Sequence, residues 1–163
     1  YMTYGDNIKP DLICLGKGIS SSLPMAALLG TADIIDVDLG ANLSGTHAGN
    51  ALGSAACLAN LEVLTDKQFQ KDLKERSKVF EERSKNLLKY DCVTHVNARG
   101  MVVGIVFDTA ERTNKIVFDC IENGVLPVCT FRESIKLGPP LTIPVSAINE
   151  AFDVLEECIQ GRS

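Results

Sequence analysis

The sequence predicts an α/β fold with a small α+β portion at its C-terminal end. Apolar runs of strand length open the chain, helical patterns fill its middle, and short strands alternate with helices from about residue 91. We therefore expect three parts. Residues 1–64 form the end of a large α/β domain, residues 65–90 a connecting helix, and residues 91–163 a small α+β domain.

The first part is expected to hold two short strands and a helix. Residues 10–17 form an apolar run between a proline and a glycine, which predicts a buried strand, and residues 25–30 predict a second one. A loop at 18–24 joins them. From Asn50, small and apolar residues recur every three or four positions, which predicts a helix that ends near Leu64.

The connecting helix is predicted to run to about Lys89. Thr65 followed by Gln68 fits a capping box, with Thr65 as the N-cap residue. The alternating charges of the helix are typical of a solvated face. Its apolar side chains, expected to be buried, are Phe69, Leu73, Phe80 and Leu87.

The last part is predicted to alternate strands and helices. Strands are expected at 101–107, 125–129 and 134–137, and a helix at 111–122. Ser146 is the expected N-cap of a final helix. The buried face of that helix is predicted to consist of Ile148, Phe152, Leu155 and Ile159.

Composition narrows the range of functions. The chain has 163 residues, 45% of them hydrophobic, and a net charge of −5, which favours a globular protein and argues against a nucleic-acid or anionic-membrane partner. No apolar stretch approaches the roughly 20 residues of a membrane span. The six cysteines are scattered and form no C-x-x-C pair. This spacing argues against a metal site and favours buried free thiols in the cytoplasm.

Lys17 is the residue on which the functional interpretation depends. It stands between Gly16 and Gly18 at the end of the first apolar run, so its amine is expected to be accessible and partly desolvated. A neutral amine forms a Schiff base with an aldehyde. A phosphate-loop motif does not fit, because Asp11 stands where that motif needs its first glycine and Gly18 comes directly after the lysine. A lone lysine in a turn is more often an ordinary surface residue, so its role depends on the segments later in the chain.

A loop of small residues at 44–50 precedes the first predicted helix. Its hydroxyls and backbone N–H groups lie at the positive end of a helix dipole, which suits a phosphate. Together with a Schiff-base lysine, such a loop fits a phosphorylated aldehyde. Pyridoxal 5′-phosphate (PLP) is one.

Three ordered segments resemble the class III, ornithine/4-aminobutyrate-type, PLP-dependent aminotransferases. Residues 10–19 with 23–27 resemble the segment that carries the cofactor lysine of that family. Residues 45–52 resemble its Gly-Thr-x-x-Gly-Asn-Pro segment, with alanine in place of the proline, and residues 139–143 resemble its C-terminal signature.

The resemblance implies a fold and a set of roles. The fold is the C-terminal part of a fold-type I PLP-dependent transferase, in which residues 1–64 end the PLP-binding domain. Lys17 would carry the Schiff base and then act as the proton shuttle, while Gly45 and Thr46 would bind the cofactor phosphate, usually across the interface of a homodimer. The implied reaction is transamination between an amino-acid or amine donor and a 2-oxo acid.

Two departures from the family pattern bear on function. Lys136 stands where the family commonly has an arginine that binds a substrate carboxylate, so either Lys136 binds it as a point charge, Arg132 replaces it, or the substrate differs. Lys136 is equally well a solvated strand residue. The family's aspartate that pairs with the pyridine nitrogen has no counterpart in residues 1–10. We therefore expect this chain to be the C-terminal portion of such an enzyme, and loss of activity in that portion alone is one expected outcome.

Two alternatives stay open. Aminomutases and amino-acid racemases share the scaffold and begin with the same deprotonation. The second alternative is not an enzyme: in this hypothesis the chain as it stands is a non-catalytic association module, whose exposed sheet edge favours assembly.

Overall fold

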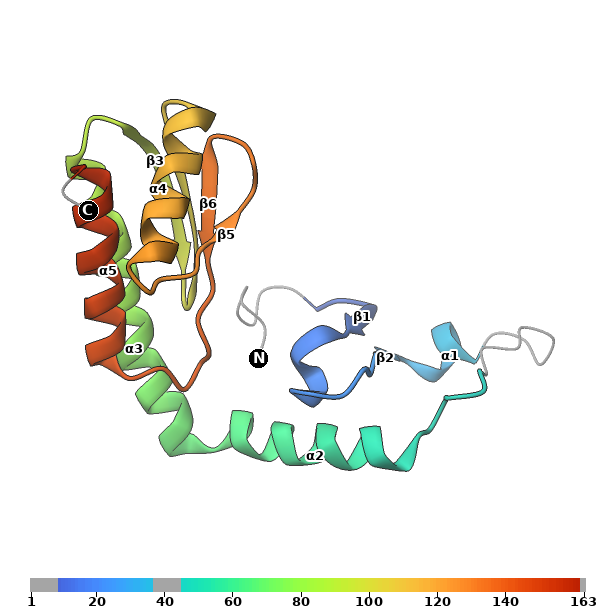
Figure 1. Ribbon diagram of the computed structural model, residues 1–163. Helices are drawn as coiled ribbons and strands as arrows, with labels where there is room; N and C mark the ends of the chain where they lie inside the picture. The colour runs from blue at the N-terminus through green and yellow to red at the C-terminus, as the bar shows by residue number, and fades with distance from the viewer. Residues whose placement is uncertain (1–8, 37–44, 162–163) are drawn as a thin grey trace. The chain divides into compact units, whose positions relative to one another are not determined.

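The computed structural model describes residues 9–36 and 45–161. The chain divides into two compact units, one up to Phe69 (unit 1) and one from Gln70 (unit 2), and each is described by itself. Figure 1 draws both units and labels their helices and strands where there is room.

Unit 1 begins with an antiparallel strand pair around a tight turn. β1 (Leu12–Leu15) pairs with β2 (Ala27–Gly30), and the 3₁₀ turn η2 (Lys17–Ser20) follows β1 directly. Both strands lie where the sequence predicts them. The expectation that the first is buried is wrong, because Leu12 is 45% exposed and Cys14 is exposed as well. Among residues 9–36 and 45–161, each of these strands pairs with the other and with no further strand.

Two helices complete the described part of unit 1. A short helix, α1 (Ala32–Ile35), follows β2, and α2 (Ala51–Thr65) is the long helix predicted from Asn50. The Asn50 side chain is the N-cap of α2, since its Oδ1 accepts a hydrogen bond from the Gly53 N–H at 2.9 Å. α2 packs on η2, and a Cβ added at Gly53 would lie 3.6 Å from the Met25 sulfur, an ordinary van der Waals contact.

The second long helix, α3 (Lys67–Asn86), crosses the boundary between the units. The predicted capping box is wrong by one residue. Thr65 is the last residue of α2, and its hydroxyl donates back to the Leu61 carbonyl at 2.8 Å. Asp66 caps α3 instead, because its Oδ1 accepts from the Phe69 N–H at 2.8 Å.

Unit 2 is built on a four-stranded antiparallel sheet in the order β3-β4-β6-β5. Its strands are β3 (Val93–Arg99), β4 (Val102–Phe107), β5 (Val128–Cys129) and β6 (Ser134–Leu137). β4 and β6 match the predicted strands closely, whereas β5 is shorter than predicted. Burial alternates along β4, so one face of the sheet is covered and the other is open.

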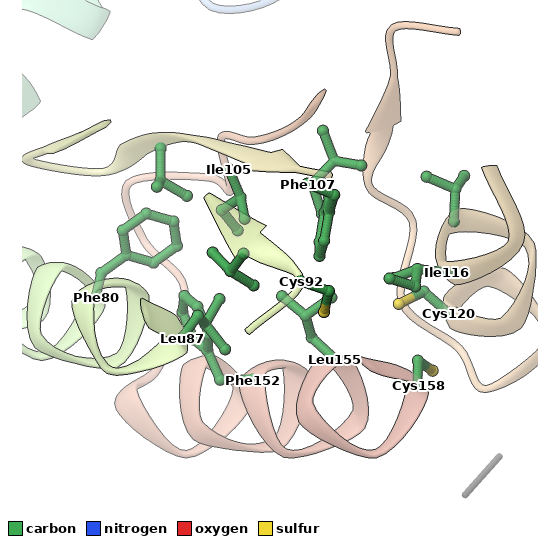
Figure 2. Packing of buried hydrophobic residues seen from close by; sticks show 14 of the residues in the cluster. Phe80, Leu87, Cys92, Ile105, Phe107, Ile116, Cys120, Phe152, Leu155 and Cys158 are labelled. Carbon is green, nitrogen blue, oxygen red and sulfur yellow. The ribbon is translucent and has the colours of Figure 1, made fainter. Parts of the chain in front are cut away.

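Three helices cover that face: α3, α4 (Ala110–Glu122) and α5 (Val145–Ile159) (Figure 1). Figure 2 shows how Phe80 of α3, Phe152 of α5 and Ile105 of β4 pack into one core. The Phe80 and Phe152 rings meet edge to face with centroids 5.4 Å apart. The predicted faces of α3 and α5 are thus largely confirmed, with Phe69, Leu73 and Ile159 only half-buried.

The predicted cap of α5 is wrong. Pro144 occupies the N-cap position, and Ser146 lies one residue inside the helix. The Ile148 N–H bonds to the Pro144 carbonyl at 3.2 Å, which is the first turn of the helix. The Pro144 backbone is extended, with φ −71° and ψ 151°, and its own side chain offers no capping hydrogen bond.

The cysteines are free in the structure. Cys57, Cys92, Cys120 and Cys158 are buried, as predicted, while Cys129 is half-buried and Cys14 is exposed. Within residues 9–36 and 45–161, no helix is long and apolar enough to cross a membrane. In the same ranges, no cluster of His, Cys, Asp and Glu side chains is arranged to hold a metal ion.

Candidate active site

Lys17 occupies a strained turn at the end of β1. Its φ is +49°, in the left-handed region, and Ser21 at the other end of the turn has φ +64°. Residues with a Cβ adopt this region at a cost of roughly 1–2 kcal/mol each. Such backbone conformations persist where surrounding contacts fix them, and they occur often at functional sites.

The surroundings of Lys17 leave its amine open. A Cβ added at Gly16 or Gly18 would meet no atom within 4 Å. The Lys17 side chain is exposed, so the expected partial desolvation is wrong for the described part of the chain. The predicted accessibility of the amine, in contrast, is confirmed.

Several hydrogen bonds close the turn. The Ile19 N–H donates to the Gly16 carbonyl and the Ser21 N–H to the Gly18 carbonyl, both at 3.2 Å. The buried Ser20 hydroxyl donates to the Leu23 carbonyl. Two more come from α2, where the Asn60 amide donates to the Gly18 and Ile19 carbonyls. Sequence reasoning missed Asn60, although a polar residue inside an alanine-rich helical face was a usable signal.

The predicted phosphate loop is a turn that leads into α2. The structure describes it from Gly45, and Ser44 lies outside the described residues. The Ala48 N–H donates to the Gly45 carbonyl at 2.9 Å, and Gly49 has φ +66°, which favours glycine. Gly45 and Thr46 are both exposed, so their N–H groups and the Thr46 hydroxyl are available to an anion.

A cavity of about 570 Å³ lies beside that turn in unit 1. His47 and Leu52 contribute to its wall, together with residues 23–26. Lys17 and Thr46 are not among its lining residues. The cavity is therefore next to the predicted phosphate turn without containing the predicted covalent site.

Lys136 and Arg132 occupy different places in unit 2. Lys136 lies on β6, opposite Gly104 of β4 and Val128 of β5, and its side chain is exposed. It lines a largely apolar cavity of about 520 Å³ together with residues 138–140. Arg132 lies in the turn before β6 and is not part of that wall. Of the two candidates for the carboxylate contact, Lys136 is therefore the one that lines this cavity.

Comparisons with known proteins agree with these motifs. The profile of the class-III aminotransferase family matches residues 1–159. The acetylornithine aminotransferase of Clostridium acetobutylicum is 26% identical over 155 residues, which cover 94% of this chain and 40% of that protein. The alanine/serine racemase of Pyrococcus horikoshii is 28% identical over 163 residues, covering 94% of this chain and 34% of that protein.

A solved structure shows the same fold. The acetylornithine aminotransferase from Elizabethkingia anophelis matches with a TM-score of 0.85 at 27% identity, over 97% of this chain and 41% of that one. The fold is thus a mixed α/β part of a PLP-dependent transferase, as predicted. The chain belongs to the class-III aminotransferase family. It spans between 34% and 41% of the length of these three relatives.

Proposed function

We propose that this chain supplies the cofactor lysine of a PLP-dependent aminotransferase. The observation that carries the proposal is the position of Lys17, exposed in a left-handed turn between two glycines with open space around them. The family match over residues 1–159 supports the same assignment.

The residues present suit PLP chemically. The aldehyde needs an accessible amine, which Lys17 offers, and the phosphate needs hydrogen-bond donors, which the turn at Gly45 and Thr46 offers. When bound, PLP supplies an electron sink for the carbanion formed at the substrate Cα. In the homodimer that we propose, the turn with Thr46 serves the cofactor of the other subunit.

Lys17 has two tasks in this proposal. It holds the cofactor covalently through Nζ, and once released it carries a proton to and from the substrate Cα as general base and acid. Its four-carbon stem lets Nζ sweep over the reacting atoms while the turn keeps Cα in place. The fixed turn therefore limits the mobility of the amine to its side-chain torsions.

We propose Lys136 as the group that binds a substrate carboxylate. It offers an ammonium at the edge of an apolar cavity, next to the Gly-Pro-Pro segment. A lysine binds a carboxylate as a point charge, whereas an arginine forms two parallel hydrogen bonds. We therefore expect Lys136→Arg to tighten binding of a carboxylate donor and Lys136→Ala to weaken it. The proposed substrates are an amino-acid or amine donor and a 2-oxo acid, and the proposed location is the cytoplasm.

Covalent trapping tests the assignment of Lys17. The chain is incubated with PLP, reduced with borohydride, digested, and the modified lysine is identified by mass spectrometry. We expect modification concentrated at Lys17, lost in Lys17→Ala and retained in Lys9→Ala, which removes an exposed lysine near the start of β1. Equal modification of all exposed lysines in the wild-type chain would overturn the proposal and favour the non-catalytic association module.

Amino-acid racemization is the second candidate, favoured by the similarity to the alanine/serine racemase. The two reactions differ in the fate of the donor nitrogen. With a ¹⁵N-labelled amino acid and an unlabelled 2-oxo acid, a transaminase moves the label to the new amino acid. A racemase produces the opposite enantiomer of the donor and leaves the label where it was.

A further inference from the structure

A polar side chain of α2 reaches the turn that carries Lys17. The Asn60 Nδ2 lies 2.8 Å from the Gly18 carbonyl oxygen and 3.0 Å from the Ile19 carbonyl oxygen. An amide nitrogen carries two hydrogens, so each carbonyl receives one. The opposite orientation of the amide would place its oxygen against two carbonyl oxygens. The contact therefore requires a donor at this position.

The backbone hydrogen bonds of the turn are uneven: the Ser22 N–H donates to the Ser20 carbonyl at 2.8 Å, but two others are longer than either contact of Asn60. Within the turn, the Ile19 and Ser21 N–H groups make 3.2 Å contacts, at the long end of the usual range. The turn also holds two residues with a Cβ, Lys17 and Ser21, in the left-handed region. A strained turn with long internal hydrogen bonds needs an external support. Asn60 provides one from a helix more than forty residues later in the chain.

The hydrogen bonds from Asn60 reach the two residues whose backbone sets the direction of the Lys17 side chain. Gly18 and Ile19 come directly after Lys17, and neither Gly16 nor Gly18 has a side chain to pack. The direction of the Lys17 side chain is then set by the backbone path of the turn. We propose that Asn60 is a positioning residue for Lys17, fixing the direction in which its amine leaves β1. This inference rests on the proposed function of Lys17.

Two substitutions distinguish the hydrogen bonds that the Asn60 amide donates from the packing of its side chain. Asn60→Leu keeps a similar volume and removes both hydrogen bonds, while Asn60→Gln keeps the amide on a stem one methylene longer. Glu62→Leu is the matched control, a polar-to-leucine change at an exposed position of the same helix. The Glu62 carbonyl accepts a hydrogen bond from the Thr65 hydroxyl, and this backbone contact is kept in the control.

The first measurement is the ratio of PLP trapped at Lys17 to PLP trapped at the other lysines of the same molecule. We expect Asn60→Leu to lower this ratio roughly tenfold, as the loss of one to two ordinary hydrogen bonds would, and Asn60→Gln to restore part of it. Glu62→Leu should leave the ratio unchanged. A merely destabilised chain would lose PLP without this rescue by the conservative variant.

The second measurement does not depend on PLP. Amide hydrogen exchange of a peptide covering residues 16–23 should accelerate in Asn60→Leu by a similar factor, while exchange in α2 and in unit 2 stays as in Glu62→Leu. If the wild-type chain traps no PLP at Lys17, the proposed function fails and the exchange result alone decides whether Asn60 fixes the turn. If Lys17 is labelled but Asn60→Leu matches the wild-type chain in both measurements, the positioning role is refuted and the proposed function stands.

Discussion

Glu156 on α5 joins three segments of unit 2 through one carboxylate. It accepts hydrogen bonds from Lys89 at 2.5 Å and Tyr90 at 2.8 Å through Oε2, and from Arg83 at 3.2 Å through Oε1. Burial alone would raise the pKa of Glu156, but the hydrogen bonds from Lys89 and Tyr90, together with the positive charges of Lys89 and Arg83, outweigh it, so the pKa lies below its ordinary value. The network ties the end of α3 and the segment after it to α5.

Replacing this carboxylate by an amide tests its contribution. Glu156→Gln keeps the shape of the side chain and removes its charge, so the half-buried Arg83 keeps its 2.6 Å ion pair with Asp153 and loses the one with Glu156 at 3.2 Å. A hydrogen bond to a charged group contributes about 1.5–3 kcal/mol. Solvent screens the exposed Lys89, and Gln still accepts one hydrogen bond, so we expect a loss of about 1–2 kcal/mol in the free energy of unfolding at pH 7.

The effect should depend on pH in one direction. A carboxyl whose pKa is lowered by folding contributes stability above its unfolded pKa, roughly 4.3, and loses it as the pH falls through the folded value. The difference in the free energy of unfolding between wild type and Glu156→Gln therefore has its largest value at pH 7. It should begin to shrink below about pH 5 and vanish once Glu156 is protonated in the folded chain.

Urea unfolding followed by far-ultraviolet circular dichroism measures this difference, since the chain has no tryptophan for fluorescence. Glu157→Gln is the matched control, because Glu157 is the exposed neighbour of Glu156 on the same helix. Equal stability of the two variants at pH 7, or a difference that does not change down to pH 3, would refute the reasoning.

Three further features are tested with substitutions in the same unfolding assay. Gly100 has φ +60° with open space around a Cβ, so Gly100→Ala should lose roughly 1–2 kcal/mol to backbone strain alone, and Gly100→Asn less; equal losses would contradict this account. Phe152→Ala should lose about 3–5 kcal/mol, since the ring is 1% exposed and packs on Phe80, and a loss under 1 kcal/mol would show that the core refills the space. Asp66→Ala should cost about 1 kcal/mol as the true N-cap of α3 and Thr65→Ala less, the reverse of what the sequence pattern predicts.

Periodicity is sufficient to predict much of unit 2. β6 lies at the predicted residues, and the apolar stripe of α5 is buried at Ile148, Phe152 and Leu155. These patterns repeat over several turns or strand positions, so a local error changes little. Caps depend on one residue, which is why the predictions for Thr65 and Ser146 are wrong: several Ser, Thr, Asp and Pro residues compete within three positions, and the path of the chain decides among them.

Contacts between distant residues lie beyond local pattern reasoning. Glu156 and Lys89 stand 67 residues apart, and Asn60 and Gly18 stand 42 apart. Charges spaced along α3 predict only a solvated face, yet Arg83 turns toward α5 and lies 5.6 Å from the Phe152 ring centroid. The burial of β1 is overpredicted for the same reason, because an apolar run shows that a strand can be buried and not what covers it.

The distribution of buried residues separates stability from chemistry in this chain. The apolar core cluster lies wholly in unit 2, from Phe80 to Cys158, whereas Cys57 is the one buried hydrophobic residue in the described part of unit 1. Lys17, Thr46 and Asn60 all belong to unit 1. Cooperative unfolding should therefore report mainly on unit 2, and Gly100→Ala should lower the urea midpoint while the ratio of PLP trapped at Lys17 stays unchanged under native conditions. Asn60→Leu should leave the urea midpoint unchanged and lower the ratio of PLP trapped at Lys17. A variant that moved both quantities together would show that the Lys17 turn draws its order from the core of unit 2 rather than from α2.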